Sequence, residues 1–336
     1  MRLAMKPAMR PTAMRPIAIM LWLLMLAGPA LSPARADDYP SRNITLLCPF
    51  PAGGGTDIMT RLLGSALQDK LKTTVVVEDR PGAATQIAAN ATAKAPPDGY
   101  TLLVATSTTL AYGPSVFKKL PYDTVKDFAP IALVGSAQFA LVANPRLGAK
   151  TLPELIAKIR ASDGKLSYAT SGHSTPHHLF MEMFLKMIGA KAVHVPYRGS
   201  GPGLMGLIGG EVDIMMVDLA VALPQIKAGK VIAYGLTAPP RAEALPDLPT
   251  LAEAGLPGYS AQGWFSVVTR AGTPRPIIDR LNHILVDYLK SDEAKRRLSA
   301  LAIQPMTSTP DELAAFIPAE ITKWAKVVKD AGITPQ

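Results

Sequence analysis

Short apolar runs alternate with amphipathic stretches along most of the chain. The runs have the length of single strands, and the stretches between them place apolar residues three or four positions apart. The predicted strands are residues 44–48, 73–79, 100–107, 130–144, 165–170, 192–197, 211–218, 231–237, 263–269 and 302–307. The clearest predicted helices are residues 56–71, 152–162, 276–290 and 311–331. This alternation predicts an α/β fold with mostly parallel sheets.

Two of these helices carry clear local signals. Thr151 followed by Glu154 has the spacing of a capping box and predicts the start of helix 152–162. Helix 56–71 has an apolar stripe, which indicates one buried face. The residues of this stripe are Ile58, Leu62, Leu63, Ala66 and Leu67.

Two strand-like segments, residues 130–144 and 261–274, are long for single strands. Each could leave one domain and enter another. A chain that crosses twice gives a discontinuous first domain and a continuous second one, with a cleft between them and the crossings as a hinge.

The first 36 residues have the pattern of a secretion signal. Basic residues without any acid precede an apolar run at 17–27, and Ala34-Arg35-Ala36 fits a cleavage site. The apolar run is shorter than the roughly 20 residues of a membrane span, so a membrane anchor is the less favoured alternative. We therefore expect a periplasmic protein cleaved near Ala36.

The charge argues against a nucleic-acid-binding protein, and the cysteine content argues against a protein stabilised by disulfides. The formal net charge is +9, but five of the basic residues lie in the signal, so the charge falls to +4 without it. No cluster of Lys and Arg interleaved with aromatic residues remains, which argues against nucleic-acid binding. Cys48 is the single cysteine, so no disulfide can form within the chain. Its place on an apolar strand favours a small buried side chain over a catalytic thiol.

A glycine-rich turn joins strand 44–48 to helix 56–71. Three glycines at 53–55 precede Thr56 and Asp57. Glycines let N–H groups approach a ligand closely, and a helix N-terminus favours negative charge, so the unit can cradle an anion. An ordinary glycine turn stays the alternative, and the pattern of a nucleotide-binding P-loop is absent. We expect Asp57 to cap the helix rather than act as a base.

A second strand–loop–helix unit spans residues 166–189. Its loop, residues 171–175, offers hydroxyl and N–H groups, and two such loops in two domains could close on one carboxylate. His173, His177 and His178 suggest a metal, but their neighbours do not form H-E-x-x-H and no acid is well spaced as a further ligand. No metal is therefore expected.

Two further patterns resemble those of other protein classes. Residues 201–206 match G-x-G-x-x-G after strand 192–197, with Asp218 downstream. The helix that follows is only about two turns, which is short for dinucleotide binding, so a loop that orders the cleft is favoured. Ser171 and Ser174 are candidate nucleophiles of a hydrolase, but no G-x-S-x-G elbow occurs. His283 lies mid-helix among charged residues, which predicts a solvent-facing side chain.

Blocks distributed over nearly the whole chain after the signal resemble the substrate-binding proteins of tripartite tricarboxylate transporters, also called the Bug family. These blocks are ITLLCPFPAGGGTD, VVVEDRPGAA, AKAPPDGYTLL, LPYDTVKDFAPIALV, YATSGHSTPHHL, HVPYRGSGPGLMGLIGGEVDIM, LPDLPTLAEAGLPGY and AGTP. Many blocks in one order are more specific than any single glycine motif.

The resemblance implies a type-II periplasmic binding-protein fold: two α/β domains around a central ligand cleft, with two crossover strands as hinge. We place domain 1 at residues 37–138 and 262–336 and domain 2 at residues 139–261. By position, the resemblance also implies a set of ligand-binding residues. They are Phe50, Ala52, Gly53, Gly54, Gly55, Ser107, Thr108, Ser171, Gly172, His173, Ser174, Thr175 and Asp218.

This chain departs from the family pattern at two places. His173 stands where a small polar residue is common, and it could add a hydrogen bond or a charge near a carboxylate. Val217 stands where the family often has an acid, which weakens the case for an α-ammonium group in the ligand, although Asp218 could still pair with an amine.

The sequence thus predicts an exported receptor for a small carboxylate such as a di- or tricarboxylate or an aromatic acid. It predicts no catalysis and no cofactor. The expected partners are the ligand and the membrane permease subunits of a tripartite tricarboxylate transporter, with no nucleic acid, and the receptor is expected to be a monomer. The alternatives are an exported serine hydrolase using Ser171 or Ser174, and a ligand sensor that docks on a membrane kinase.

Overall fold

The computed structural model describes residues 39–335 except Gly54. The predicted signal peptide, its cleavage site and Gly54 lie outside these residues. Within the described part of the chain, every helix is too short or too polar to span a bilayer.

The first of two sheets has six strands in the order β11-β4-β10-β3-β1-β2. β1 pairs in parallel with β2 and β3, whereas β10 lies between β3 and β4 and is antiparallel to both. These strands are β1 (Ile44–Cys48), β2 (Val75–Asp79), β3 (Thr101–Thr106), β4 (Phe128–Ala137), β10 (Gly263–Arg270) and β11 (Ile303–Pro305).

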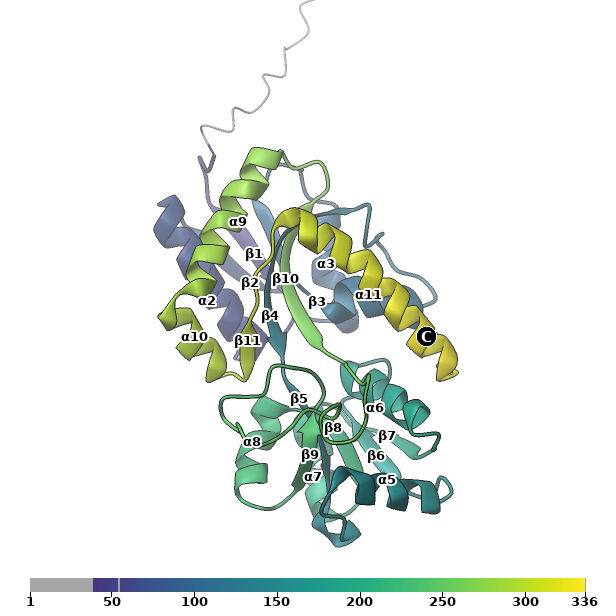
Figure 1. Cartoon of the computed structure of the whole chain (residues 1–336). Helices are drawn as coiled ribbons and strands as arrows, with labels where there is room; N and C mark the ends of the chain where they lie inside the picture. The colour runs from purple at the N-terminus through teal and green to yellow at the C-terminus, as the bar shows by residue number, and fades with distance from the viewer. Residues whose placement is uncertain (1–38, 54, 336) are drawn as a thin grey trace, which may run out of the picture. The chain divides into compact units, whose positions relative to one another are not determined.

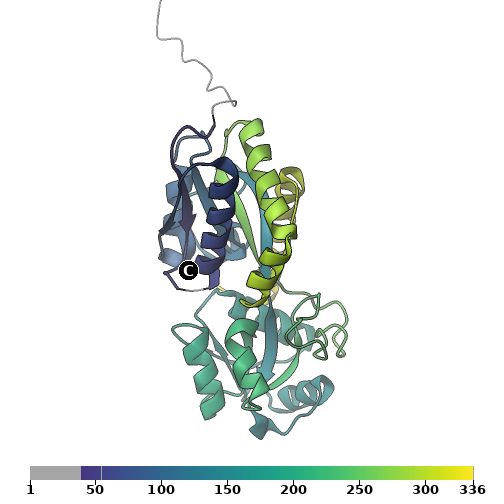
Figure 2. The ribbon, with the colours of Figure 1, turned by 90° about the vertical axis from the view of Figure 1, so that its left-hand side faces the viewer.

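Helices pack on both faces of this sheet. α2 and α9 lie side by side over one face, as Figures 1 and 2 both show, and α3 and α11 lie over the other. The helices are α2 (Gly55–Leu71), α3 (Gln86–Ala93), α4 (Gly113–Val116), α9 (Arg275–Lys290), α10 (Asp292–Ser299) and α11 (Pro310–Asp330). Single turns occur at η2 (Ala83–Thr85) and η3 (Thr108–Tyr112). We call this sheet with its helices the first lobe.

The second sheet has five strands in the order β7-β6-β8-β5-β9. The strands are β5 (Phe139–Ala143), β6 (Ser167–Thr170), β7 (Val193–Pro196), β8 (Ile214–Asp218) and β9 (Ile232–Leu236). The helices are η4 (Pro145–Leu147), α5 (Leu152–Ala161), α6 (Pro176–Met187), α7 (Ser200–Gly209) and α8 (Leu219–Lys227). We call this sheet with its helices the second lobe.

Every predicted strand is present, but the expectation of mostly parallel sheets is wrong. Among the described strands, four pairings are parallel and five are antiparallel. Each antiparallel pairing involves β5 or β10 or the pair β4 and β11. A strand–helix–strand crossover between neighbouring strands would have made these pairings parallel.

The predicted strand 130–144 breaks at Gln138 into β4 and β5, which lie in different sheets. Gln138 N–H bonds to the Ala302 carbonyl at 3.3 Å, and the Gln138 carbonyl accepts from Leu219 N–H at 2.8 Å. The chain therefore passes between the lobes here without a regular turn. The other long segment, 261–274, begins with Ala261 N–H bonded at 3.0 Å to the carbonyl of Thr237, which follows β9, and continues as β10 in the first sheet, so it also passes between the lobes.

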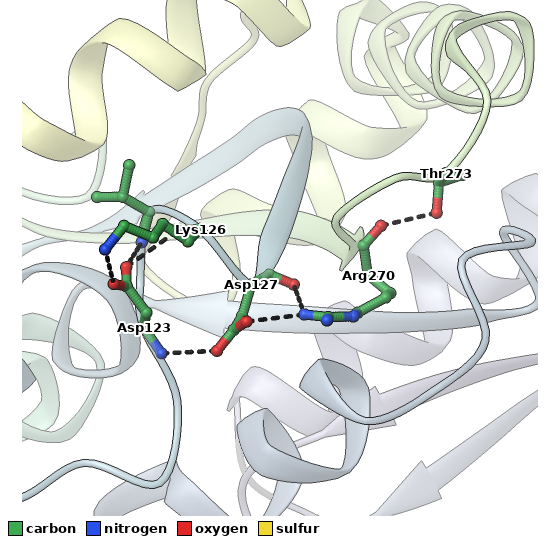
Figure 3. A network of polar contacts seen from close by, with 6 residues as sticks. Asp123, Lys126, Asp127, Arg270 and Thr273 are labelled. Carbon is green, nitrogen blue, oxygen red and sulfur yellow. Dashed lines mark hydrogen bonds and ion pairs between the residues drawn. The ribbon is translucent and has the colours of Figure 1, made fainter.

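A polar network joins the start of β4 to the end of the neighbouring strand β10 (Figure 3). Arg270 Nη1 donates to Asp127 Oδ1 at 2.8 Å and to the Asp127 carbonyl at 3.1 Å. Asp127 Oδ2 accepts from Asp123 N–H at 2.8 Å. The Asp123 N–H and then Arg270 favour the charged carboxylate, so the pKa of Asp127 is lowered.

Aromatic side chains from both lobes meet in one core. Trp324 of α11 lies 4.7 Å from Tyr112 and 5.3 Å from Phe180 of α6, measured between ring centroids. Glu320 Oε2 accepts from Trp324 Nε1 at 3.0 Å and from Trp264 Nε1 at 3.1 Å. One buried carboxylate therefore joins α11 to β10.

Some local predictions are confirmed and others are corrected. Cys48 is fully buried and His283 is exposed, as expected. In α2, Ile58 is 40% exposed and Met59 takes its place in the core, because Met59 lies one turn before Leu63 and shares its buried face. At Thr151 only half of the capping box forms, since Glu154 accepts from Lys150 N–H instead.

Candidate functional site

Two adjoining cavities lie between residues of the two lobes. Their volumes are about 600 and about 480 Å³. Both are lined by Phe50, Thr56, Ala137, Ser200, Asp218 and Phe265. Because they share these residues, we treat the two cavities as one site and call it the cleft.

The loop from β1 to α2 forms one wall of the cleft. Gly53 takes a φ of +86° that favours glycine, and its N–H donates to Asp57 Oδ2 at 2.7 Å. Arg61 Nε lies 2.7 Å from Asp57 Oδ1. Asp57 therefore closes the loop and is not free to act as a base. The first N–H groups of α2 have no partner within the helix, and Thr56 in this turn lines the cleft.

Hydroxyl groups cover the part of the cleft that follows β3. Thr85, Thr106, Ser107 and Thr108 all line the smaller cavity. Behind them, Thr109 Oγ1 lies 2.9 Å from Thr85 Oγ1 and 3.1 Å from Thr106 Oγ1. This buried network holds the turn that presents Ser107 and Thr108 to the cleft.

In the second lobe, Ser171, His177 and Asp218 form a hydrogen-bonded chain along the cleft. Ser171 Oγ lies 2.8 Å from His177 Nδ1, and His177 Nε2 lies 2.8 Å from Asp218 Oδ2. Burial opposes the charge on Asp218, but His177 and then Ser200 favour it, and the pKa of Asp218 is lowered overall. An ionised Asp218 only accepts, so it fixes a proton on His177 Nε2 and positions the ring beside Ser171.

This chain of residues does not support the hydrolase alternative. In a Ser–His–Asp triad the serine bonds to Nε2 and the aspartate to Nδ1, whereas the two nitrogens are exchanged here. The neighbouring Gly172 N–H, a candidate donor to an oxyanion, already donates to Thr170 Oγ1 at 3.2 Å.

Several main-chain amides of the two loops are engaged within the protein. Besides Gly53 and Gly172, Ser174 N–H donates to His178 Nδ1 at 3.2 Å. The expectation that two glycine-containing loops present free amides is therefore wrong at these three positions. Hydroxyl groups are the commonest polar side-chain groups at the surface of the cleft, and those of Ser171 and Thr175 already contact His177 Nδ1 and the Gly172 carbonyl.

The structure brings most of the predicted site residues together. Those that line the cleft are Phe50, Ala52, Gly53, Gly55, Ser107, Thr108, Ser171, Thr175 and Asp218. Gly172, His173 and Ser174 do not line it, because the loop bends at Gly172 (φ +130°) and at Ser174 (φ +59°). His173 and Ser174 instead line a separate cavity of about 300 Å³ together with residues 331–334.

His173 and His178 line this separate cavity, and the ring of His194 packs against both of them. Burial, and then the rings of His194 and His173, lower the pKa of His178 to about 3. Burial and then His173 lower the pKa of His194 to about 4. Both rings are uncharged at neutral pH. Val217, the other departure from the family pattern, is fully buried in the core of the second lobe.

Sequence reasoning missed several residues that line the cleft. They are Thr56, Thr85, Thr106, Phe139, His177, Gly199, Ser200, Trp264 and Phe265. Thr85 follows one of the family-like blocks and Ser200 lies within another, so block position could have indicated both. The sequence pattern marks His177 only as a candidate metal ligand, and nothing in it places this side chain beside Asp218.

Two α/β lobes joined by crossing strands, with a cleft between them, define a type-II periplasmic binding protein. The chain belongs to the family described as the tripartite tricarboxylate transporter family receptor, whose profile matches residues 59–333. This is a family of receptors rather than enzymes.

Named relatives match along almost their full length. The chain is 38% identical to protein BugT of Bordetella pertussis over 319 residues, which cover 95% of this chain and 98% of that protein. It is 34% identical to a UPF0065 protein from the tcbD-tcbE intergenic region of a Pseudomonas species, with 88% of each chain covered.

Solved structures share the same fold. The structure of R. palustris Rpa4515 with adipate has a TM-score of 0.79 at 34% identity, covering 89% of this chain and 100% of that one. MatC from Rhodopseudomonas palustris with bound malate has a TM-score of 0.73 at 32% identity, covering 86% and 100%. The periplasmic binding protein BugD has a TM-score of 0.74 at 32% identity, covering 89% and 100%.

Proposed function

We propose that the cleft captures a small organic acid with at least one carboxylate and that the receptor delivers it to a membrane permease. The observation that carries this proposal is the composition of the cleft. Hydroxyl groups and a helix N-terminus from one lobe face Ser171, Thr175 and Ser200 from the other. Relatives of the same family have been solved with adipate and with malate.

The electrostatics of the cleft favour an anion held mainly by hydrogen bonds rather than by an ion pair. Neither Lys nor Arg is among its described lining residues. The one lining carboxylate, Asp218, is hydrogen bonded to His177 and so is partly compensated. Hydrogen bonds to a charged group contribute about 1.5–3 kcal/mol each, so a few of them can offset the cost of immobilising a small acid.

Calorimetric titration of the chain without residues 1–36 tests this function. The panel contains malate, adipate, citrate, benzoate, glutamate and glucose. We expect at least one organic acid to bind with micromolar affinity or better. Binding of glucose with no response to any of the acids would overturn the proposal.

Ser171→Ala should weaken binding of the acid found in this screen severalfold, because it removes a hydroxyl that lines the cleft and holds the His177 ring in place. Ser162→Ala is the matched control, because Ser162 lies at the end of α5 and its hydroxyl donates to the Ile159 carbonyl at 2.7 Å. Equal affinity in both variants would remove Ser171 from the binding site.

We also infer the arrangement of the exported receptor. Residues 1–36 are cleaved as a signal peptide, residues 37–138 with 262–336 form domain 1, and residues 139–261 form domain 2. The receptor works as a monomer with permease subunits as its membrane partners. The intact mass of the periplasmic form tests the cleavage near Ala36, and its sedimentation tests the monomer.

A further inference from the structure

Three of the five histidines of this chain gather outside the cleft. His173 comes from the loop after β6, His178 from the first turn of α6, and His194 from β7. Each histidine offers one ring nitrogen, and these three nitrogens all lie within 4.8 Å of one another. The three segments are brought together by the parallel pairing of β6 with β7.

A hydrogen bond holds the ring of His194 in place. Thr170 Oγ1 lies 3.1 Å from the Gly172 carbonyl and 2.7 Å from His194 Nε2. With the Thr170 proton on the carbonyl contact, His194 Nε2 donates to the hydroxyl and Nδ1 keeps a lone pair for a metal. A hydrogen bond to one ring nitrogen orients a histidine that ligates a metal through the other.

A carboxylate lies beside the same histidines. Glu182 Oε1 is 4.0 Å from His178 Nε2, and Tyr168 donates a hydrogen bond to Glu182. Glu182 also lines the cavity of about 300 Å³ that reaches His173 and His178. The cavity gives an ion access to the cluster and gives the carboxylate room to approach it.

We propose that His173, His178 and His194 bind one divalent transition-metal ion of the zinc class, with Glu182 as a fourth ligand. Three imidazoles and a carboxylate suit Zn²⁺, Ni²⁺ or Cu²⁺, whereas Mg²⁺ and Ca²⁺ prefer oxygen ligands alone. The sequence-based expectation of no metal considered His173, His177 and His178 but not His194, which lies on β7.

Metal binding requires a local rearrangement. The rings of His178 and His194 stack at 4.1 Å with an angle of 11° between their planes, so their lone pairs cannot converge without rotation of one ring. His178 Nδ1 also accepts from Ser174 N–H at 3.2 Å, a contact it gives up if it ligates through this atom. His173 is exposed and makes no hydrogen bond with any described residue, so it can move to complete the site.

Titration of the untagged chain without residues 1–36 with ZnCl₂, in a buffer that does not chelate, tests the site. We expect one Zn²⁺ per chain with micromolar affinity or better. Co²⁺ used as a probe should give the intense visible absorption of four-coordinate cobalt. Absence of Zn²⁺ binding would overturn the proposal, and no organic acid is added, so this failure would leave the proposed function intact.

Variants locate the ion. His194→Ala and His173→Ala should each weaken Zn²⁺ binding at least tenfold, whereas His283→Ala, which removes an exposed histidine on α9, should not change it. His173→Ala keeps the test decisive if His194→Ala fails to fold, because His173 is on the surface. Unchanged affinity in His173→Ala, or equal loss in His283→Ala, would show that the ion binds elsewhere.

Discussion

Gly172 shows how a single residue directs the loop that follows β6. Its φ is +130°, a conformation that residues with a side chain rarely adopt. An added Cβ would meet nothing closer than Thr175 Cγ2 at 3.7 Å. A substitution here is therefore costly because of backbone strain and not because of a clash.

Gly172→Ala should lower the free energy of unfolding by about 1–3 kcal/mol, the usual cost of such a conformation. Gly209→Ala is the matched control, since Gly209 ends α7 and an added Cβ there meets nothing within 4 Å. The control should be neutral or stabilising by up to about 1 kcal/mol. Urea denaturation measures both, and equal values would contradict the assignment of strain to Gly172.

At the scale of elements, polar side chains join helices and strands that are distant in sequence. Glu320 of α11 accepts from two indole N–H groups, one of which belongs to Trp264 of β10, and it is almost fully buried. Arg270 and Asp127 join the ends of β10 and β4 (Figure 3). These contacts fix which helix covers the sheet and where β10 enters it.

Glu320→Leu should destabilise the protein by about 3 kcal/mol, because it leaves two buried N–H groups without an acceptor. Glu320→Gln keeps an acceptor oxygen and should lose less than half as much. Thermal unfolding followed by tryptophan fluorescence measures both variants. A loss in Glu320→Gln as large as in Glu320→Leu would show that charge rather than hydrogen bonding matters.

The Asp127–Arg270 contact predicts a pH dependence. The pKa of Asp127 is lower in the folded chain than its ordinary value, so its contribution to stability is complete above about pH 4 and is lost as the pH falls through the folded pKa. Asp127→Asn should therefore lose about 1 kcal/mol at pH 7 and clearly less at pH 3.

Asp247→Asn serves as the control for this pH dependence, since Asp247 is exposed and makes no ion pair with any described residue. It should leave stability unchanged at both pH values. Urea denaturation at pH 7 and pH 3 gives the comparison. If Asp127→Asn lowered the free energy of unfolding by the same amount at pH 7 and at pH 3, the assignment of this pH dependence to Asp127 would be wrong.

At the scale of the whole molecule, the cleft and the aromatic core both use residues of the two lobes. Trp264 belongs to the first lobe and lines the cleft, and its ring N–H is held by Glu320. Phe139 and Phe180 of the second lobe pack 5.0 Å apart beside the same core. Because residues of both lobes line the cleft, a ligand bound there would contact both at once.

The acid that binds in the cleft should stabilise both lobes in one transition. At a free concentration 100 times its dissociation constant, it should raise the free energy of unfolding by about 2.7 kcal/mol, which amounts to several degrees in the melting temperature. Differential scanning calorimetry measures this shift. Two separate transitions, of which only one moves, would show that the ligand contacts a single lobe.

The positions of the strands and the main helices were predictable from the sequence, because alternation of apolar and polar residues is a local property of the chain. The strand order was not predictable in this way, since β10 is inserted between β3 and β4 by contacts across more than one hundred residues. The break at Gln138 was likewise hidden within one continuous apolar run.

The sequence by itself determined the elements, the family and part of the residues that line the cleft. Only the tertiary structure decided that Gly53 and Gly172 direct their N–H groups inward, that His177 lies between Ser171 and Asp218, and that His194 joins His173 and His178. The physical reason is that hydrogen-bond partners and metal ligands are chosen by proximity in space. Proximity depends on strand pairing and loop bends that no local pattern specifies.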